Sequence, residues 1–467
     1  MITSRAFAGR KYAVYGLARS GLATVEALLA SGATVTAWDA KEEARERLRS
    51  SLSFARGGGP SNEDSMVEGS APNPSTTPFG SGPPPRASRR EELIVADLDT
   101  ADLAQFDSLV VTPGLPLNRH PIAERARKAG VEIIGDIELF ARARPELPPH
   151  KVVGITGTNG KSTTTALAHH ILKTAGVPAT MGGNIGLPIL AQDPLPEGGV
   201  YVLELSSYQI DLTQSLDCDV AVLLNITPDH LDRYDSFEAY AASKARLFEM
   251  QSLHHWAVIA VDDPAARKIA ADLGRLDMTR VSAPKRFKRQ PDWPALQGPH
   301  NAQNVAAAIA AVGELGVHRP TIEVALRSYA GLPHRMECIR EKDGVLFVND
   351  SKATNPTATA PALAAFDRIR WICGGQAKTD NLDECAPHFD HVAKAYTIGE
   401  AGDLFARLLS PHIAVAECGT LERAVGAAAA EAVSGDTVLL SPACASFDQF
   451  RDFEDRGDQF RELVGEL

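Results

Sequence analysis

The sequence is poor in the features that mark secreted, membrane-spanning and nucleic-acid-binding proteins. Its six cysteines include no CxxC pair, so we expect reduced thiols rather than a disulfide framework. No apolar run approaches the roughly 18 residues of a membrane span, and the N-terminus lacks the apolar core of a signal peptide. Asp and Glu (59) outnumber Lys and Arg (47), and the net charge of −12 argues against nucleic acid or an anionic membrane as the main partner. These absences predict a soluble cytoplasmic protein.

Apolar residues, by contrast, are plentiful. They make up 44% of the 467 residues, which is ample for globular cores, and the length predicts about two to four domains. Short apolar runs alternate with helical patterns along much of the chain, as is typical of α/β domains.

One segment, 152–165 (VVGITGTNGKSTTT), has the order that a phosphate requires. An apolar run leads into a glycine-rich turn, and we expect a helix from Ala166. Backbone N–H groups of such a turn wrap phosphate oxygens, Lys161 would reach the β- and γ-phosphates, and Ser162 would ligate Mg²⁺. The match to the P-loop pattern is incomplete, because Ile155 stands where the first glycine belongs. The strand–turn–helix context favours ATP binding over a structural turn.

A βαβ unit is predicted near the N-terminus. Lys11–Tyr15 runs into GLARSG (16–21), a helix is expected over about 22–30, and a second strand over 33–38 ends at Asp39. This is the arrangement of a nucleotide-binding half-fold. Ala18 stands where the GxGxxG fingerprint has its second glycine, so the turn by itself indicates only some nucleotide, or none.

The segment 57–90 interrupts this region. Gly, Pro and Ser make up 19 of its 34 residues, a composition that cannot bury enough apolar surface to offset the entropy of ordering. We expect a disordered surface insertion without a chemical role. The fold resumes at 93–96, and 141–151 is expected to link the first region to the ATP-binding region.

Polar residues follow the apolar runs after the glycine turn. Glu204 ends one run, where a carboxylate can hold Mg²⁺ near the γ-phosphate. His230, in NITPDHLDRYD after the next run, suits a second metal ligand as readily as an ordinary loop residue. Asp229 and Asp232 are competing ligands that the spacing leaves open.

Three further side chains have a functional and a structural interpretation. Lys244 lies in the helical pattern 237–250, where most lysines are simply solvated. Asn304 shares a helix face with Asn301, and their amides suit a nucleotide or a helix cap. Arg335 suits a phosphate or carboxylate, with a boundary salt bridge as the alternative.

Strands of the last third end in polar loops, which open α/β sheets use to bind ligands. In NDSKATNP (349–356), Asn355 or Thr354 is a plausible N-cap before Pro356, and Lys352 suits a substrate carboxylate. The loops GGQAK (374–378) and SPACASFDQF (441–450) repeat this theme. Ser446 is not in a GxSxG elbow, so a serine nucleophile is a poor interpretation.

Taken together, these strings resemble the Mur ligase family. The motifs that carry the resemblance are GITGTNGKST (154–163), GGNIGLP (182–188), LELSSYQ (203–209), NITPDHLDRY (225–234), HNAQN (300–304), GLPHRME (331–337), NDSKATNP (349–356) and SPACASFDQFRDFEDRGDQF (441–460). The resemblance implies an α/β protein of three domains: a Rossmann-like UDP-binding domain (1–140), a central P-loop ATPase domain (141–331) and a C-terminal Rossmann-like α/β domain that binds an amino acid (332–467).

NDSKATN and SPACASFDQF are most similar to the family member that adds D-glutamate to UDP-N-acetylmuramoyl-L-alanine in peptidoglycan synthesis. Such ligases transfer the γ-phosphate of ATP to a carboxylate, and the amine of the amino acid then attacks the acyl phosphate. The implied partners are these two small molecules, without nucleic acid, and we expect a monomer. A ligase that adds L-glutamate, a folylpolyglutamate synthetase, or a non-catalytic P-loop switch remains as an alternative.

The matched motifs also imply residue roles. ATP-binding positions are Gly157, Thr158, Asn159, Gly160, Lys161, Ser162, Thr163, Asn304, Arg335 and Asp350. Two Mg²⁺ sites would use Ser162, Glu204, His230 and a carbamylated Lys244; carbamylation needs a neutral amine, which a desolvated site favours. Lys161, Glu204, His230 and Lys244 are the expected catalytic residues. Substrate positions are Ala18, Arg19, Ser20, Asp39, Lys41, Thr112 and Asn184 for the UDP substrate, and Lys352, Thr354, Lys378, Ser446, Phe447 and Phe453 for D-glutamate. Ala18, Lys41 and the GGQAK loop depart from the commoner family residues.

Overall fold

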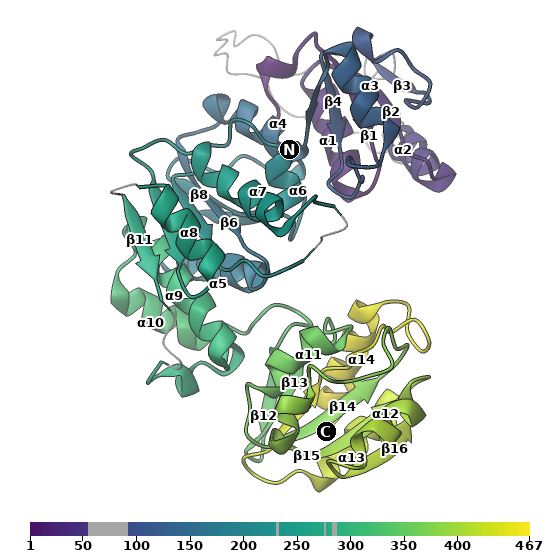
Figure 1. Ribbon diagram of the computed structural model, residues 1–467. Coiled ribbons are helices and arrows are strands. Elements are labelled where there is room, and N and C mark those ends of the chain that lie inside the picture. The colour runs from purple at the N-terminus through teal and green to yellow at the C-terminus, as the bar shows by residue number, and fades with distance from the viewer. Residues whose placement is uncertain (55–91, 230–232, 275–276, 283–286) are drawn as a thin grey trace, which may run out of the picture. The chain divides into compact units, whose positions relative to one another are not determined.

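The fold is seen in a computed structural model that describes residues 1–54, 92–229, 233–274, 277–282 and 287–467. Three separate sheets account for its strands, and each falls within one of the three predicted domain ranges (Figure 1). The chain also divides into two compact units, 1–154 with 180–219 and 228–252, and 155–179 with 220–227 and 253–467. Boundaries near 140 and 331 therefore stay a prediction, and the expected insertion at 57–90 lies outside the described residues. Within the described part of the chain, every helix is too short or too polar to cross a bilayer.

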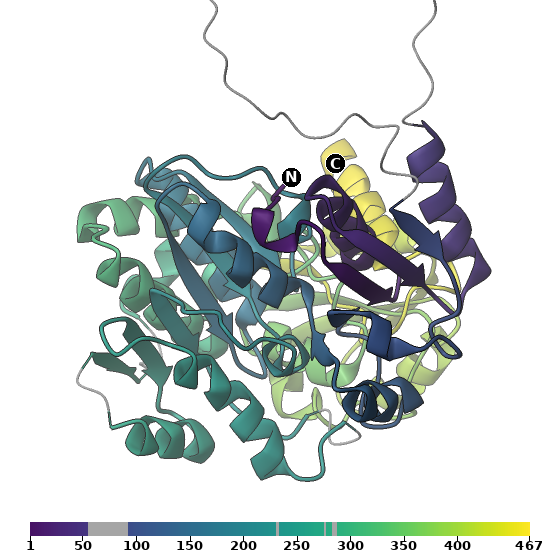
Figure 2. The same cartoon turned by 90° about the horizontal axis from the view of Figure 1, so that it is seen from above.

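The first sheet has five strands in the order β3-β2-β1-β4-β5, and all its neighbours are parallel. The strands are β1 (Lys11–Tyr15), β2 (Thr34–Trp38), β3 (Leu93–Val95), β4 (Ser108–Val111) and β5 (Glu132–Ile134), drawn as purple to blue arrows in Figure 2. Its helices are η1 (Arg5–Phe7), α1 (Arg19–Ala30), α2 (Glu42–Phe54), η3 (Leu103–Gln105), α3 (Pro121–Ala129) and α4 (Asp136–Ala143). The strand order reverses between β1 and β4, and a reversal of this kind is where open α/β sheets bind ligands. The predicted GLARSG turn follows β1 directly.

The second sheet has the order β11-β10-β9-β6-β8-β7. Its strands are β6 (His150–Thr156), β7 (Ala179–Gly183), β8 (Gly199–Glu204), β9 (Val220–Leu223), β10 (Trp256–Ala260) and β11 (Met278–Val281). The accompanying helices are η4 (Arg144–Glu146), α5 (Lys161–Thr174), η5 (Ile189–Ala191), α6 (Ser207–Asp211), α7 (Phe237–Glu249), α8 (Pro264–Asp272), η6 (Gln290–Asp292), η7 (Pro294–Leu296), α9 (Pro299–Glu314) and α10 (Arg319–Ser328).

One sequence-based boundary in this region is wrong. The helix after the glycine turn begins at Lys161, not at Ala166, because Gly160 adopts a left-handed conformation (φ 82°) and serves as its N-cap. Lys161, Ser162 and Thr163 are thus in the first helical turn. The segment 141–151, which we expect to link the first region to the ATP-binding region, contains the end of α4 at Ala143, a 3₁₀ turn and the start of β6 at His150.

The third sheet has the order β12-β13-β17-β14-β15-β16, with β12 antiparallel to β13 and the other pairs parallel. Its strands are β12 (Glu337–Lys342), β13 (Val345–Asn349), β14 (Ile369–Gly374), β15 (Val392–Ile398), β16 (Val415–Gly419) and β17 (Thr437–Leu440). Its helices are α11 (Pro356–Leu363), η8 (Ala386–His391), α12 (Gly402–Leu409), α13 (Leu421–Glu431) and α14 (Phe453–Glu466). The predicted N-cap Asn355 with Pro356 at the first helical position is confirmed.

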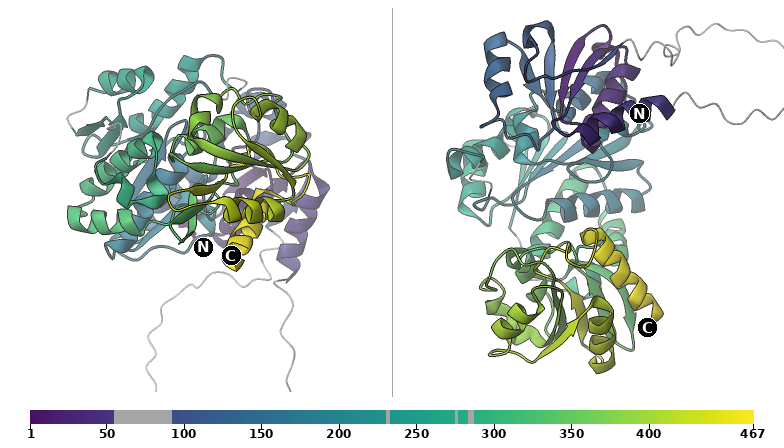
Figure 3. Two further views of the ribbon diagram at one scale, coloured as in Figure 1. Left: turned by 90° about the horizontal axis from the view of Figure 1, so that it is seen from below. Right: turned by 90° about the vertical axis from the view of Figure 1, so that its right-hand side faces the viewer.

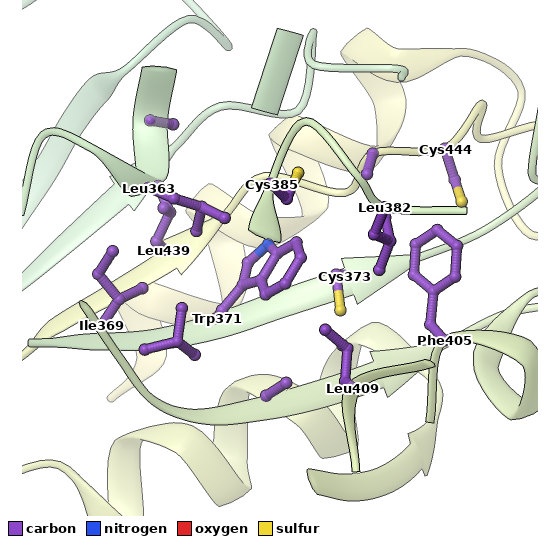
Figure 4. Packing of buried hydrophobic residues seen from close by; sticks show 14 of the residues in the cluster. Leu363, Ile369, Trp371, Cys373, Leu382, Cys385, Phe405, Leu409, Leu439 and Cys444 are labelled. Carbon is purple, nitrogen blue, oxygen red and sulfur yellow. The ribbon is translucent and has the colours of Figure 1, made fainter. Parts of the chain in front are cut away.

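Helices cover both faces of this third sheet (Figure 3). Successive residues of a strand point to opposite faces, so Trp371 and Cys373 join one apolar cluster while Ile372 joins the other. Figure 4 shows the first cluster, in which Trp371 is surrounded by aliphatic and cysteine side chains. The two cores hold the strands rigidly and leave the loops at the carboxyl ends of β13, β14 and β17 to carry polar groups.

Candidate active site

The glycine turn after β6 is closed over by its own lysine. Lys161 Nζ donates to the carbonyl oxygens of Gly157 (3.0 Å) and Thr158 (2.8 Å). A Cβ on Gly160 would lie 2.1 Å from Asn304 Oδ1, so a larger residue there would have to displace the Asn304 side chain on α9. The turn therefore places a cation and an amide side chain at the N-terminus of α5, where backbone N–H groups already favour an anion.

A cavity of about 520 Å³ adjoins this turn. Its lining includes several residues predicted from separate motifs to bind the nucleotide, namely Asn159, Gly160, Thr163, Asn304, Arg335 and Asp350. Asn304 Nδ2 donates to Asn301 Oδ1 (3.0 Å), so the predicted shared face is confirmed. The capping interpretation of these two residues is wrong, because Gly298 is the N-cap of α9.

The carboxyl group of Asp350 is buried at the edge of this cavity. Its Oδ2 accepts from Ser441 Oγ (2.8 Å) and its Oδ1 from the Met336 N–H (3.1 Å). Burial raises the pKa of Asp350 to about 7, and the two hydrogen bonds and the Arg335 charge oppose that rise. The group therefore changes charge near neutral pH, next to a pocket suited to an anionic ligand.

Glu204, at the end of β8, fits a magnesium ligand. Its side chain is 2% exposed, Oε1 accepts from Asn184 Nδ2 (3.0 Å), and Oε2 is buried without a hydrogen-bond partner among the described residues. A buried carboxylate oxygen left in this way is costly unless a cation or a further donor meets it. Carboxylate and hydroxyl oxygens, as in Glu204 and Ser162, are the ligands that Mg²⁺ prefers.

The other predicted metal ligands are only partly described. Lys244, on α7, is 1% exposed, and its Nζ lies 4.6 Å from the centroid of the Tyr240 ring. His230 and Asp232 lie outside the described residues. Within the described part, no three His, Cys, Asp or Glu side chains form a metal-binding group.

Loops of the third sheet bring most of the predicted amino-acid-binding residues together. Lys352 Nζ lies 5.1 Å from the Phe453 ring centroid, and Lys378 Nζ donates to Thr354 Oγ1 (3.3 Å). The backbones of Gln376 and Ala445 exchange two hydrogen bonds of 2.9 Å, which tie the GGQAK loop to the SPACASFDQF loop. Next to this tie, Ser446 is buried and Phe447 is 68% exposed.

Arg456, on α14, is a site residue that the sequence did not single out. It is fully buried, and its guanidinium donates to Ser351 Oγ and O (both 2.9 Å) and to Cys444 O (3.1 Å). Burial lowers the pKa of Arg456 to about 10. The side chain therefore fastens the loop that carries Lys352 to the loop that carries Ser446. Its position in an amphipathic helix gave no signal of this, because burial of an arginine depends on what packs over it.

The glycine turn of the first sheet is built around two side chains. Asp39 Oδ2 accepts from the Leu17 N–H (2.7 Å) and Oδ1 from the Lys41 N–H (2.9 Å). Gly16 (φ 98°) lies against Thr112, whose Oγ1 would be 2.2 Å from an added Cβ. Thus two predicted substrate residues, Asp39 and Thr112, lie at this turn, and the backbone of a third, Lys41, is bonded to Asp39.

The remaining predicted residues of this turn open or cap α1. Ala18 is the N-cap, and Arg19 donates to the Gly186 carbonyl (3.3 Å). Ser20 and Thr112 line a small pocket together with Asp136, a residue that sequence reasoning missed. Burial raises the pKa of Asp136 to about 6.

Comparison with known proteins identifies the class that this fold and these loops define. Residues 155–294 match the Mur ligase middle domain and residues 334–444 match the Mur ligase glutamate ligase domain. The chain belongs to the Mur ligase family.

Two relatives with high identity over the whole chain carry the same enzyme name. The chain is 57% identical over 470 residues to the UDP-N-acetylmuramoylalanine–D-glutamate ligase of Novosphingobium aromaticivorans, covering 100% of this chain and 97% of that one. It is 56% identical over 473 residues to the protein of the same name from Sphingopyxis alaskensis, with 100% of both chains covered.

Solved structures support the fold. The UDP-N-acetylmuramate–alanine ligase of Thermotoga maritima has a TM-score of 0.53 at 16% identity, covering 98% of this chain and 99% of that one. A MurF ligase of Thermotoga maritima in complex with ADP has a TM-score of 0.51 at 19% identity, covering 74% of this chain and 92% of that one.

Proposed function

We propose that the chain is an ATP-dependent ligase that joins D-glutamate to UDP-N-acetylmuramoyl-L-alanine in the cytoplasmic synthesis of peptidoglycan precursors. The observation that carries this proposal is the 57% identity, over the whole chain, with a relative named for that reaction. The cavity beside the glycine turn, lined by Asn304, Arg335 and Asp350, supports ATP as the second substrate.

The chemistry accounts for these residue types. A carboxylate is a poor acylating agent, since its leaving group would be oxide. Transfer of the γ-phosphate to the alanyl carboxylate gives an acyl phosphate and ADP. The D-glutamate amine then attacks the acyl carbon, a tetrahedral intermediate forms, inorganic phosphate leaves, and the amine loses a proton. Catalysis of this kind rests on positioning and on stabilising phosphoryl charge.

The residues of the glycine turn would hold the nucleotide. Lys161 would leave its own turn carbonyls and meet the β- and γ-phosphates, with the remaining turn residues Gly157–Gly160, Ser162 and Thr163 around them. Asn304, Arg335 and Asp350 would contact the nucleotide from α9 and the third sheet. Mg²⁺ held by Ser162 and Glu204 would neutralise phosphate charge.

A second Mg²⁺ would be held by His230 and a carbamylated Lys244. The burial of Lys244 supports this role, because an amine removed from water is more readily neutral and able to add carbon dioxide. Lys244→Ala should lose most activity, and short carboxylic acids added to the assay should partly restore it by supplying the missing carboxylate. Exposed Lys268→Ala is the matched control, and full activity of Lys244→Ala without added acid would refute the carbamate.

The two other substrates would occupy the remaining loops. Lys352 and Lys378 would meet the carboxylates of D-glutamate, with Thr354, Ser446, Phe447 and Phe453 around them. Asp39, Lys41 and Thr112 would bind the uridine diphosphate together with Ala18, Arg19 and Ser20, and Asn184 would contact the muramoyl part. We further propose that the domains end near 140 and 331 and that the protein acts as a monomer.

Phosphate release from ATP, measured with UDP-N-acetylmuramoyl-L-alanine and either D-glutamate or L-glutamate, tests the proposal. Release that requires both the UDP substrate and D-glutamate is the expected result. Release with L-glutamate alone would keep the ligase and overturn its specificity. Release without either substrate, or none with both, would favour a switch or a sibling ligase.

A further inference from the structure

The glycine turn is hydrogen-bonded along its length to residues 224–227, the segment that follows β9. The Leu224 N–H donates to Thr156 O (3.0 Å), and the Thr158 N–H donates to Asn225 O (2.8 Å). The side chain of Thr158 adds two more bonds: its Oγ1 accepts from the Thr227 N–H (3.0 Å) and donates to Thr227 O (3.2 Å). Residues 224–227 thus hold the turn in place, and this support does not depend on a bound nucleotide.

One side chain of this segment grips the backbone of the turn at Asn159. Asn225 Oδ1 accepts from the Asn159 N–H (2.8 Å), and Asn225 Nδ2 donates to Asn159 O (3.1 Å). The second hydrogen of Nδ2 goes to Gln303 Oε1 (2.9 Å) on α9. An amide nitrogen has only two hydrogens, so both donors of Asn225 are used.

The hydrogen bonds run from Asn225 through Gln303 to the carboxylate of Asp262, and this carboxylate determines which atom donates at each step. Gln303 Nε2 donates to Asp262 Oδ2 (3.0 Å), and Ser282 Oγ donates to Asp262 Oδ1 (2.9 Å). An ionised carboxylate only accepts, so it must face the nitrogen of Gln303. The oxygen of Gln303 then faces Asn225 and requires its nitrogen there, which leaves Asn225 Oδ1 for the Asn159 N–H. The charge of Asp262 therefore sets both amide orientations.

The grip on Asn159 also orients the next peptide group. Asn159 O and the Gly160 N–H belong to one planar trans peptide and point in opposite directions. Holding Asn159 O against Asn225 therefore aims the Gly160 N–H away from Asn225. Gly160 has a positive φ, which glycine adopts readily, and it has no side chain that could fix the turn. The orientation of its N–H therefore depends on the neighbouring peptide group.

We propose that Asn225 is a positioning residue of the phosphate-binding turn, supported in series by Gln303 and Asp262. This inference rests on the proposed function, in that it takes the turn to bind the phosphates of ATP. Asn225 and Gln303 also line the adjoining cavity, so a direct contact with the nucleotide base is the competing explanation. The two explanations differ in which part of the ligand they affect: positioning acts on the phosphates, and a base contact acts on the nucleoside.

Calorimetric titration of the full chain with ADP in the presence of Mg²⁺, and separately with adenosine, distinguishes them. We expect Asn225→Ala to raise the Kd for ADP about tenfold, the effect of losing one to two hydrogen bonds, and to leave the Kd for adenosine unchanged. Asn225→Asp keeps the acceptor and loses both donations, so it should also weaken ADP binding. Gln303→Met should raise the Kd for ADP about threefold by releasing Asn225.

The series arrangement gives a second readout. In the Asn225→Ala background, Gln303→Met should have no further effect on ADP binding, because the Asn225 side chain that Gln303 supports is already absent. Gln459→Met is the matched control, since Gln459 Nε2 also donates to an aspartate (Asp455 Oδ1, 3.1 Å) but on the exposed face of α14. In turnover, the KM for ATP should rise while the KM for D-glutamate stays constant.

Equal weakening of ADP and adenosine would overturn the inference in favour of a base contact. Unchanged ADP binding in both Asn225 variants, or independent and multiplying effects of Asn225→Ala and Gln303→Met, would overturn it as well. A wild-type chain that binds no ADP would overturn the proposed function itself and this inference with it.

Discussion

The turn at 16–21 and the turn at 157–160 both carry the chain from a strand into a helix, and both helices begin with a cation. Arg19 reaches outward to the Gly186 carbonyl, whereas Lys161 folds back onto the carbonyls of its own turn. The N-caps differ too: Ala18 is extended (φ −69°) and Gly160 is left-handed (φ 82°).

The two turns therefore share a strand–turn–helix outline but differ in the side chains and backbone conformation that they present. At the second turn, Lys161 folds onto the carbonyl oxygens of Gly157 and Thr158, and a cavity lies alongside, which supports the proposed phosphate site. The first turn instead offers an aspartate, Asp39, bonded to two backbone N–H groups, and a small pocket lined by Ser20 and Thr112 lies beside it. We therefore expect changes in the two turns to affect different substrates.

Replacing the two cations should give the largest contrast. Lys161→Met should lower turnover about 100- to 1,000-fold, because a positioned charge at the transferred phosphate is lost. Arg19→Met should lower it about tenfold or less, through binding of the UDP substrate alone. Phosphate release measures both, and exposed Lys173→Met in the last turn of α5 is the control. Equal losses in the two variants would contradict the distinction.

Adding one methyl group to each turn should separate the substrates. Gly160→Ala places a Cβ against Asn304, and Gly16→Ala places one against Thr112, each at positive φ. We expect about a tenfold rise in KM, for ATP in the first variant and for the UDP substrate in the second. Gly176→Ala also has a positive φ but meets no neighbour, so it should cost about 1 kcal/mol of stability and leave both KM values unchanged. A rise in both KM values from either turn variant would count against separate roles.

Each turn region also contains one buried acid, and the two should titrate in different windows. Burial raises the pKa of Asp350 to about 7 and that of Asp136 to about 6, from 3.8. Since the folded pKa is the higher one, the folded state binds more protons, and the free energy of unfolding falls as pH rises through the window.

Asparagine does not ionise in this pH range, so replacing the aspartate should remove this fall in the free energy of unfolding. Relative to wild type, Asp350→Asn should gain a few degrees in Tm between pH about 4 and 7, and Asp136→Asn should gain less, between pH about 4 and 6. Thermal melts at several pH values measure both, with exposed Asp272→Asn as the control. Parallel melting profiles for wild type and variants would exclude these carboxyl groups as the source.

The smallest effect is expected from Ala18→Gly, which restores the glycine of the dinucleotide fingerprint. Ala18 has an extended backbone that any residue adopts, so glycine relieves no strain there. We expect the KM for the UDP substrate to change by less than about twofold. A large improvement in that KM would show that the Ala18 methyl group obstructs the ligand.

The sequence was sufficient for much of the fold. The bounds of β1 were predicted without error, because a buried strand is a local apolar run between turn residues. The edge strand β12 was missed, since Glu337–Lys342 is mostly charged and its hydrogen bonds to β13, not its apolarity, make it a strand. Likewise, the start of α5 was misplaced because three threonines and a serine give weak helical signals. The helix begins at Lys161 because Gly160, in the left-handed conformation, is its N-cap.

What the sequence by itself determined is the kind of chemistry: a glycine turn with lysine and serine, acids and amides at strand ends, and the order of motifs along the chain. Only the tertiary structure decided which of these groups are held, and by what. Asn225 meets Asn159 across 66 residues and Gln303 across 78, and Arg456 meets Ser351 across 105. These partners are far apart in the sequence, and only the folded chain brings them together. They stay paired because an unpaired buried polar group is costly, and no local sequence pattern records this.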